Sequence, residues 1–184
     1  MLYNLNVDLP FSYLLNVWQE VLEKTGMVHG KALSIRKAEV SDALMLNIRK
    51  EQADTFDNSD YDLMIRTHAF LNMLSPMNYA VFYGDDLLML ISIIVIIKGV
   101  AEISFLTDEN FTCSTLSVRM AMIKAFKKAL DELPFRRIQA KVKKDFTVGT
   151  RFVEALGFES EGMMRCFGPN NTDYVMYSLL TGEK

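Results

Sequence analysis

The sequence has little of what metal sites and disulfides are made from: its 184 residues include two cysteines and two histidines. Cys113 and Cys166 are too far apart to form a CxxC pair, which argues against a zinc knuckle and a disulfide framework. No motif supplies His29 or His68 with further metal ligands, so we expect core or surface roles for both. Two isolated thiols are typical of small buried side chains in a reducing compartment. We therefore expect a cytoplasmic protein without a metal.

Long hydrophobic runs are also missing. The longest candidate, Leu87–Ile97, would be about 16 Å long as a helix, about half of the roughly 30 Å hydrocarbon core of a bilayer. Its isoleucines and valine favour a buried strand, and turn-forming residues flank it at 84–86 and 98–99. The first eight residues carry no positive charge ahead of an apolar run. We therefore expect neither a secretory signal nor a membrane partner.

No stretch rich in proline, glycine or serine divides the chain, and half of its residues are hydrophobic. A chain of this length and composition can bury one sizeable hydrophobic core, which indicates one domain. Apolar residues recur at helical spacing between Phe11 and Leu22, after Pro10 and before Gly26, and predict a helix ahead of that domain. The sequence thus predicts an N-terminal extension with one helix over 1–31 and a single domain over 32–184.

Positive charge is concentrated in one part of the chain. Between Arg119 and Arg151 there are ten basic and three acidic residues, a net charge of +7, whereas the whole chain is at −3 and the remainder therefore at −10. A local basic face in an acidic protein indicates a small polyanionic ligand or an acidic partner surface. The alternative is a solvated outer face of an amphipathic helix.

The apolar pattern from residue 33 onward predicts alternating strands and helices. Strands are expected near 33–36, 78–83, 87–97, 101–106, 138–142, 158–167 and 174–180, and helices near 41–48, 60–74, 116–133 and 147–156. The buried face of the longest helix is expected to consist of Leu116, Met120, Ile123, Phe126, Leu130 and Leu133. Because this helix joins strands 101–106 and 138–142, these should be parallel neighbours, and an anionic ligand should bind where the helix begins.

Three strings in this order resemble the GNAT superfamily of acyl-CoA-dependent acyltransferases. Residues 35–43 (IRKAEVSDA) look like the family's opening strand and helix cap, and residues 101–105 (AEISF) are similar to its central strand. Residues 137–142 (RIQAKV) followed by 152–159 (FVEALGFE) resemble its last motif, a strand and a short helix that ends in Gly-Phe. The resemblance covers about Leu33 to Leu180. It implies an α+β fold, a GNAT-like mixed central sheet of six to seven strands flanked by helices, with the extra helix at the N-terminus.

The resemblance also implies a coenzyme site, with acetyl-CoA as the cofactor. In the family, a glycine-containing loop wraps the pyrophosphate of coenzyme A at the N-terminus of the long helix. Residues 107–119 contain no glycine, and the nearest register places other donors on the motif positions. These donors are Ser114, Ser117 and Arg119. The preceding strand is expected to pair with the pantetheine arm of the coenzyme through Ile103, Phe105 and Leu106.

The resemblance places Glu102 on the strand that acetyltransferases use to deprotonate an amine, which makes it the candidate general base. The alternative is an ordinary glutamate at a strand edge. Two residues that family members use are missing here. The position of the frequent asparagine is Phe146, and the position of the tyrosine that protonates the thiolate leaving group is Val153. Tyr174 and Tyr177 on the last strand are either substitutes for that acid or core residues.

Two functions remain open from the sequence. The first is an N-acetyltransferase that transfers an acetyl group from acetyl-CoA to an amine substrate. The second is a non-catalytic binding or assembly protein of the same fold with a protein partner. The C-terminal half also resembles the small acyltransferase-like proteins of short-tailed bacteriophages, the internal virion protein A group, which implies host cytoplasm or virion as its location. Nucleic acid is not expected as a partner, because the aromatic residues near the basic face look committed to the core. These are Phe126, Phe135, Phe146 and Phe152.

Overall fold

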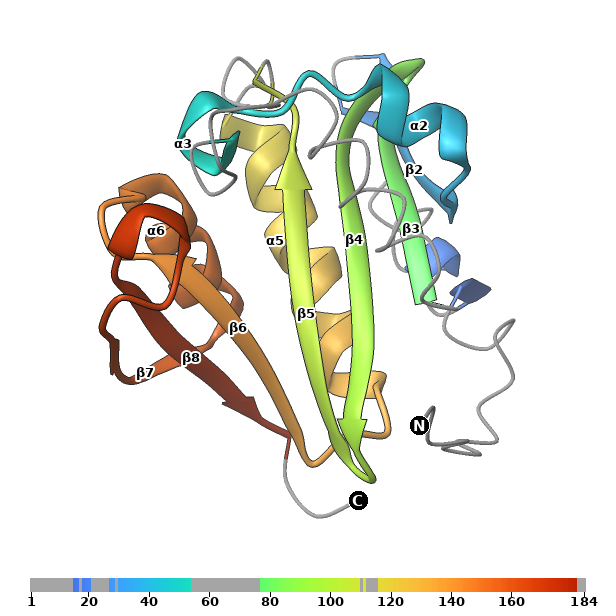
Figure 1. Ribbon diagram of the computed structural model, residues 1–184. Coiled ribbons are helices and arrows are strands. Elements are labelled where there is room, and N and C mark those ends of the chain that lie inside the picture. The colour runs from blue at the N-terminus through green and yellow to red at the C-terminus, as the bar shows by residue number, and fades with distance from the viewer. Residues whose placement is uncertain are drawn as a thin grey trace.

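The computed structural model describes residues 15–16, 18–20, 27–28, 30–53, 77–109, 111 and 116–181. In this part of the chain, one mixed β-sheet carries helices on both faces (Figure 1). The strand order is β1-β2-β3-β4-β5-β6-β8-β7. The strands are β1 (Met27–Val28), β2 (Lys31–Lys37), β3 (Met77–Tyr83), β4 (Asp86–Ile97), β5 (Val100–Thr107), β6 (Arg137–Lys143), β7 (Glu159–Met164) and β8 (Tyr174–Leu180). The helices are α2 (Val40–Met45), α3 (Lys50–Ala53), α5 (Leu116–Glu132) and α6 (Thr147–Leu156), with a 3₁₀ turn η3 (Pro169–Asn171).

The predicted α+β fold with a mixed sheet is confirmed. Seven of its strands have six residues or more, and the two-residue β1 adds a short antiparallel pairing at the β2 edge. The two predicted hairpins are present as the antiparallel pairs β3/β4 and β7/β8. Gly84 turns the first hairpin with φ +60°, a conformation that residues with a side chain rarely adopt. Gly157 ends α6 in the left-handed conformation, as predicted, with φ 98° and ψ 10°.

The segment β5–α5–β6 is the crossover that the sequence predicts. β5 and β6 are parallel neighbours, and every other neighbouring pair in the sheet is antiparallel. A strand, a helix and a parallel strand connect in a right-handed sense, which lays the helix across one face of the sheet. The expected carboxyl-end opening between these two strands therefore exists, and the functional site is built around it.

The buried face of α5 differs from the prediction. Leu116 and Met120 are 67% and 56% exposed, while Phe126 and Leu130 are buried as expected. The residues that complete the buried face are Val118, Met122, Ala125 and Ala129. The helix packs through small alanines because they allow its backbone to approach the sheet closely, and apolar size alone does not reveal this choice. Neither α5 nor another described helix has the length and apolar character that a membrane crossing requires.

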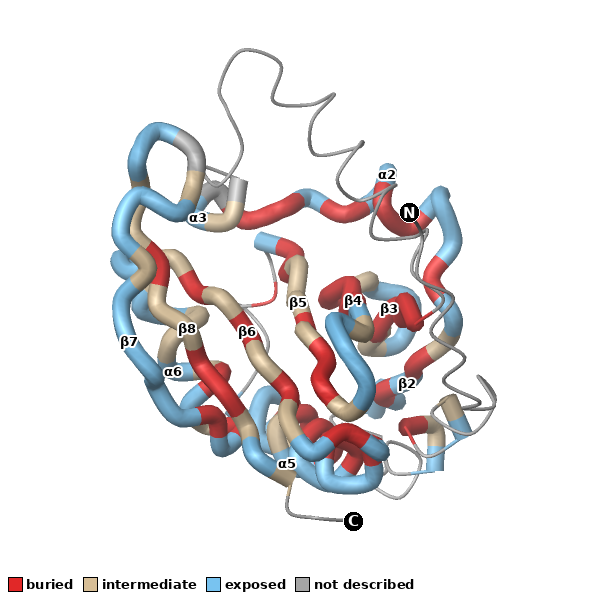
Figure 2. Tube along the Cα trace, turned by 60° about the horizontal axis from the view of Figure 1, so that its bottom comes forward, coloured by how far each residue is buried: buried red, intermediate tan, exposed pale blue. Residues whose placement is uncertain are grey.

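The two faces of the sheet carry separate apolar clusters. The larger cluster lies under α5 and α6 and takes alternate residues of the strands, such as Tyr79 and Val81 on β3 and Ile103 on β5. The smaller cluster lies under α2 and takes the intervening residues, such as Ala80 and Leu90. This alternation follows from the two-residue period of a strand. Figure 2 shows α2 and α5 on opposite sides of the strands.

The described residues of the N-terminal segment, 15–16 and 18–20, are helical and dock on the main core. Trp18 is 1% exposed, and its ring stacks on Tyr79 with 5.7 Å between centroids and lies 5.1 Å from the ring of Phe126. Trp18 therefore belongs to the same core as the sheet. The remainder of the predicted first helix and the helix predicted near 60–74 lie outside the described residues.

α2 is fixed to the sheet by an ion pair between a buried carboxylate and an arginine whose side chain is 43% exposed. The Asp42 side chain is 3% exposed and is bound by both terminal nitrogens of Arg36 on β2, at 2.6 and 2.7 Å. The same carboxylate accepts a hydrogen bond from the backbone N–H of Glu39, which is the N-cap of the helix. A bidentate arginine pair of this kind orients the helix as well as closing its first turn.

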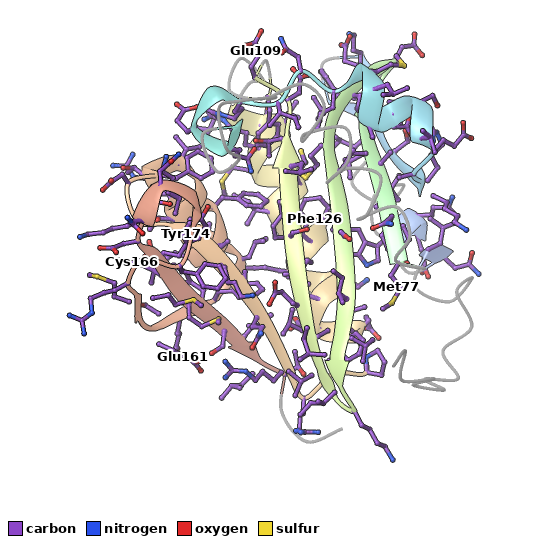
Figure 3. All side chains as sticks on the ribbon, viewed as in Figure 1. Met77, Glu109, Phe126, Glu161, Cys166 and Tyr174 are labelled. Atoms are coloured by element: carbon purple, nitrogen blue, oxygen red, sulfur yellow. The ribbon has the colours of Figure 1, made fainter. Side chains whose placement is uncertain are left out.

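The central position of Phe126 in this core gives a first testable prediction. Its ring is 1% exposed and contacts Trp18, Phe105 and Phe152 (Figure 3). We expect Phe126→Ala to lower the free energy of unfolding by about 3–5 kcal/mol, because a cavity replaces the ring. Urea denaturation followed by circular dichroism measures this. Leu116→Ala on the exposed side of α5 is the control and should change stability by less than about 0.5 kcal/mol. Equal effects of the two substitutions would contradict the observed face of α5.

Candidate functional site

The site begins where β5 and β6 separate. Their parallel pairing covers three residue pairs, Val100–Arg137, Ala101–Ile138 and Glu102–Gln139, although both strands continue beyond it. Past Glu102 the two strands splay apart, and one edge of each has no neighbouring strand among the described residues. A cavity of about 190 Å³ lies in this gap. The splay therefore produces both the space and the free backbone groups that could hold an extended ligand.

The wall of the cavity is mainly apolar and comes from four parts of the chain. β5 contributes residues 103–107, β6 contributes residues 140–143, and α6 with its preceding turn contributes Phe146, Phe152 and Val153. Residues 49 and 51–52, around the start of α3, close one side, and Phe111 and Tyr174 also line the cavity. The three β5 residues that the sequence predicts for the pantetheine arm, Ile103, Phe105 and Leu106, thus border this space. Their role as ligand contacts stays a prediction.

Gln52 occupies the free edge of β5. Its side-chain Nε2 donates to the backbone carbonyl of Phe105 at 2.7 Å, and its Oε1 accepts from the backbone N–H of Thr107 at 2.9 Å. The Thr107 hydroxyl donates to the same oxygen at 2.6 Å. One side-chain amide therefore uses the backbone groups that an adjacent strand, or the amide of an extended ligand, would use. No motif in the sequence pointed to Gln52.

Glu102 lies beside the cavity and is engaged in a polar cluster. Its carboxylate accepts a hydrogen bond from Gln139 Nε2 at 3.1 Å and is paired with Lys141 Nζ, at 3.0 Å from Oε1 and 2.8 Å from Oε2. The Glu102 side chain is 24% exposed. Lys141 lines the cavity, whereas Glu102 itself is not among its wall residues. The candidate base thus lies behind the cavity wall, next to a lysine that forms part of that wall.

A second carboxylate on the neighbouring strands is fully committed to an arginine. Glu161 binds Arg137 in a bidentate pair and accepts a hydrogen bond from the Ser178 hydroxyl at 2.7 Å. The hydrogen bonds from Arg137 and Ser178 lower the pKa of Glu161 to about 2. A carboxylate that holds its proton so weakly is a poor general base near neutral pH, which leaves Glu102 as the better candidate.

Two buried polar atoms on the cavity wall have no hydrogen-bond partner among the described residues. One is Nη1 of Arg49, a residue 9% exposed, and the other is the hydroxyl of Tyr174, a residue 6% exposed. Tyr174 lies on β8 next to the turn from β7, with the Phe167 ring 5.4 Å away (Figure 3). Tyr177, its predicted alternative, is packed in the main core. Buried polar atoms are normally paired, so both are candidates for ligand contacts.

The two predicted phosphate donors that the structure describes do not line the cavity. Ser117 and Arg119 are exposed on the first turns of α5, and Ser114 lies outside the described residues. The acidic pair that precedes them is turned to other partners: Asp108 accepts from the Asn47 N–H at 3.1 Å, and Glu109 is bonded to the Asn47 side chain. Asp108 and Glu109 are therefore engaged with the chain before α3.

Of the two cysteines and two histidines, the structure describes Cys166. The prediction that Cys166 is buried is wrong: it is exposed in the β7–β8 turn, where the chain reverses at the surface. Cys113, His29 and His68 lie outside the described residues. Across the described residues, no group of three or more histidine, cysteine and acidic side chains is arranged to hold a metal ion. The aromatic residues near the basic face are in or against the core, as predicted.

Comparison with known proteins identifies the fold. No protein-family model matches the sequence, and no curated protein matches it. Solved structures do match. An acetyltransferase of the GNAT family from Bacillus anthracis is 20% identical, with 81% of this chain and 95% of that chain covered and a TM-score of 0.60.

Two further matches were solved with their coenzyme. A ribosomal L7/L12 alpha-N-protein acetyltransferase in complex with coenzyme A is 19% identical, with coverage of 83% and 96% and a TM-score of 0.62. The protein yncA from Salmonella typhimurium, with its cofactor acetyl-CoA, is 14% identical, with coverage of 83% and 95% and a TM-score of 0.58. At this identity a structural match establishes the fold and leaves the activity open. The chain therefore has the fold of the GNAT acetyltransferases.

Proposed function

We propose that the protein is an acetyl-CoA-dependent N-acetyltransferase that binds the pantetheine arm of the coenzyme between β5 and β6. The observation that carries this proposal is the cavity of about 190 Å³ at the point where the two parallel strands separate. Its apolar wall suits a thioester arm, and ligand sites in folds with parallel strands open at the carboxyl ends of the strands. Two proteins of similar fold are named with coenzyme A or acetyl-CoA.

In this proposal the coenzyme competes with Gln52 for the edge of β5. The pantetheine arm contains secondary amides, which pair with a strand edge as the Gln52 carboxamide does. Gln52 already holds Phe105 and Thr107, so an arm that pairs there displaces it. The exchange of one amide for another preserves the number of hydrogen bonds, and its net cost is small.

The proposed chemistry is attack of the amine nitrogen on the thioester carbonyl. A C–N bond forms, the C–S bond breaks, one proton leaves the amine, and one proton goes to the thiolate of coenzyme A. Glu102 is the proposed acceptor of the first proton, directly or through water, and Lys141, an ammonium without an acceptor lone pair, holds its carboxylate beside the cavity. Tyr174 is the proposed donor of the second, because its hydroxyl is buried at the wall and forms no bond with a described residue.

The second candidate is the non-catalytic binding or assembly protein, in host cytoplasm or a virion. Three observations favour it. Val153, where family members carry a tyrosine, is a buried wall residue, and Glu102 is already paired with a lysine. In addition, Ile94, Ile96 and Ile97 are 42%, 46% and 55% exposed at the end of β4, a patch of the kind that contacts partner proteins.

Coenzyme binding is the first prediction from this proposal. We expect isothermal titration to detect acetyl-CoA binding, and Gln52→Ala to tighten it by about fivefold, because the arm no longer displaces a side chain worth roughly 1 kcal/mol. Gln19→Ala, which removes a carboxamide bonded to the β2 backbone at 3.4 Å, is the matched control and should leave the affinity unchanged. Absence of heat at millimolar acetyl-CoA would exclude the proposed function.

The role of Tyr174 is tested by removing only its hydroxyl. We expect Tyr174→Phe to lower kcat by about 10²-fold, with acetyl-CoA affinity unchanged, since the thiolate loses its proton donor. Release of free thiol, followed with a colorimetric reagent over a panel of amines, measures kcat. Because the hydroxyl has no partner among the described residues, the variant should be at least as stable as the parent. An unchanged kcat would remove Tyr174 from the mechanism.

The role of Glu102 is tested by Glu102→Gln, which keeps the shape of the side chain. We expect kcat to fall about 10²-fold and its dependence on pH to flatten on the acidic side, because the proton acceptor is gone. Glu154→Gln on the exposed side of α6 is the control. The non-catalytic function is supported instead if neither the parent nor Glu102→Gln acetylates any amine and both co-purify with the same protein partner.

A further inference from the structure

Arg49 is a buried cation at the cavity, and its ion-pair partner among the described residues, Glu51, is exposed and meets only the Nε side of the guanidinium. The residue is 9% exposed, and its Nη1 has no hydrogen-bond partner within the described part of the chain. Among the described residues, the carboxylate oxygen paired with it is Oε2 of Glu51, 3.7 Å from Nε, and the Glu51 side chain is 53% exposed. That contact is too long for a hydrogen bond and lies on the Nε side of the guanidinium. The Nη1 edge is therefore available.

The position of Arg49 is fixed by its surroundings rather than by that carboxylate. Its backbone N–H donates to the carbonyl of Thr107 at 3.2 Å, which ties the residue to the end of β5. Its guanidinium carbon lies 5.8 Å from the centre of the Phe146 ring, at the start of α6. Arg49 thus spans from one wall of the splayed gap to the other. A side chain held at both ends loses little further freedom when it binds a ligand.

The charge around the cavity also favours an anion. Its ionisable wall residues are Arg49, Lys141 and Lys143 against Glu51 alone. The charge of Lys141 is offset by Glu102 next to it. The partner of Arg49 in the described structure is an exposed carboxylate that leaves its Nη1 without a hydrogen bond. A buried guanidinium with an unused N–H group is costly, and a planar oxyanion is the group that its N–H donors fit best.

We propose that Arg49 binds an oxyanion, a carboxylate or phosphate, on a ligand whose apolar part fills the cavity. Its assignment to a reaction rests on the proposed acetyltransferase function. Two sources share this chemistry: a carboxylate on the amine acceptor, which makes the acceptor resemble an amino acid, and a phosphate of the coenzyme. The site itself is independent of that function, because it requires only the free N–H donors of Arg49.

The site is tested with simple ions on the full chain. We expect inorganic phosphate and benzoate, a carboxylate with an apolar ring, to raise Tm, and Arg49→Met to weaken their affinity roughly ten- to hundredfold. Arg49→Met should also raise Tm in the absence of anions, since it replaces a buried charge, paired in the described structure with an exposed carboxylate, by an apolar side chain of similar length. Arg165→Gln, at an exposed arginine in the β7–β8 turn, is the control for general effects of charge and should behave as the parent.

A second measurement does not depend on the variant's folding. The side-chain Nε–H resonance of Arg49, identified by its absence in Arg49→Lys, should shift when phosphate or benzoate is titrated into the parent protein. Anion effects on Tm that are equal in the parent and Arg49→Met would overturn the proposal. A resonance that does not move would overturn it as well.

Two further measurements distinguish the coenzyme from the acceptor as the source of the oxyanion. If it belongs to the coenzyme, Arg49→Met weakens binding of acetyl-CoA but not of S-acetylpantetheine, which has no phosphate. If it belongs to the acceptor, acetyl-CoA affinity is unchanged and KM rises for an amino acid such as phenylalanine but not for its methyl ester. Failure of the acetyltransferase proposal appears differently, as absence of acetyl-CoA binding while phosphate still binds.

Discussion

The limited pairing of β5 with β6 is the constraint on which the rest of the structure depends. Three residue pairs hold the two parallel strands together before they diverge. The crossover helix α5 and the aromatic rings beneath the gap keep them apart: Phe105 meets Phe152 edge-on at 5.2 Å, and Phe152 meets Phe126 at 6.4 Å. Because these rings are close-packed, the two strands cannot move together and pair further without displacing them. The opening is therefore a consequence of the core, and it exists before any ligand arrives.

The polar groups at this opening differ in how completely they are satisfied. In the pairs Arg137–Glu161 and Lys141–Glu102, each charge lies beside a charge of opposite sign. The low pKa of Glu161 follows from its hydrogen bonds with Arg137 and Ser178. Arg49 and Tyr174 each keep one buried atom without a partner in the described structure. Buried polar atoms are usually paired. Trp18 Nε1 and the Tyr79 hydroxyl in the main core also have no described partner, and what distinguishes Arg49 and Tyr174 is that both line the cavity.

The sequence predicted the order and direction of the central elements because those depend on local patterns. Leu87–Ile97 and Gly157 carry strand and cap signals that neighbours in the chain suffice to read. The prediction for the buried face of α5 was partly wrong because apolar residues occur all round this helix. The residues that face the sheet include the small Ala125 and Ala129. The contacts of the site were largely invisible, since Gln52 meets β5 across more than fifty residues and no periodicity records such a pairing.

Gln52 carries one more consequence, for ligand exchange. It fastens the short helix α3 to the border of the splayed strand, and Arg49 stands three positions earlier in the same stretch. A ligand that paired with this edge would displace the Gln52 side chain, while the backbone bond from Arg49 to Thr107 stays in place. The chain just before α3 would therefore remain docked on β5. A site in which the displaced group is one side chain can fill and empty without unfolding of the surrounding structure.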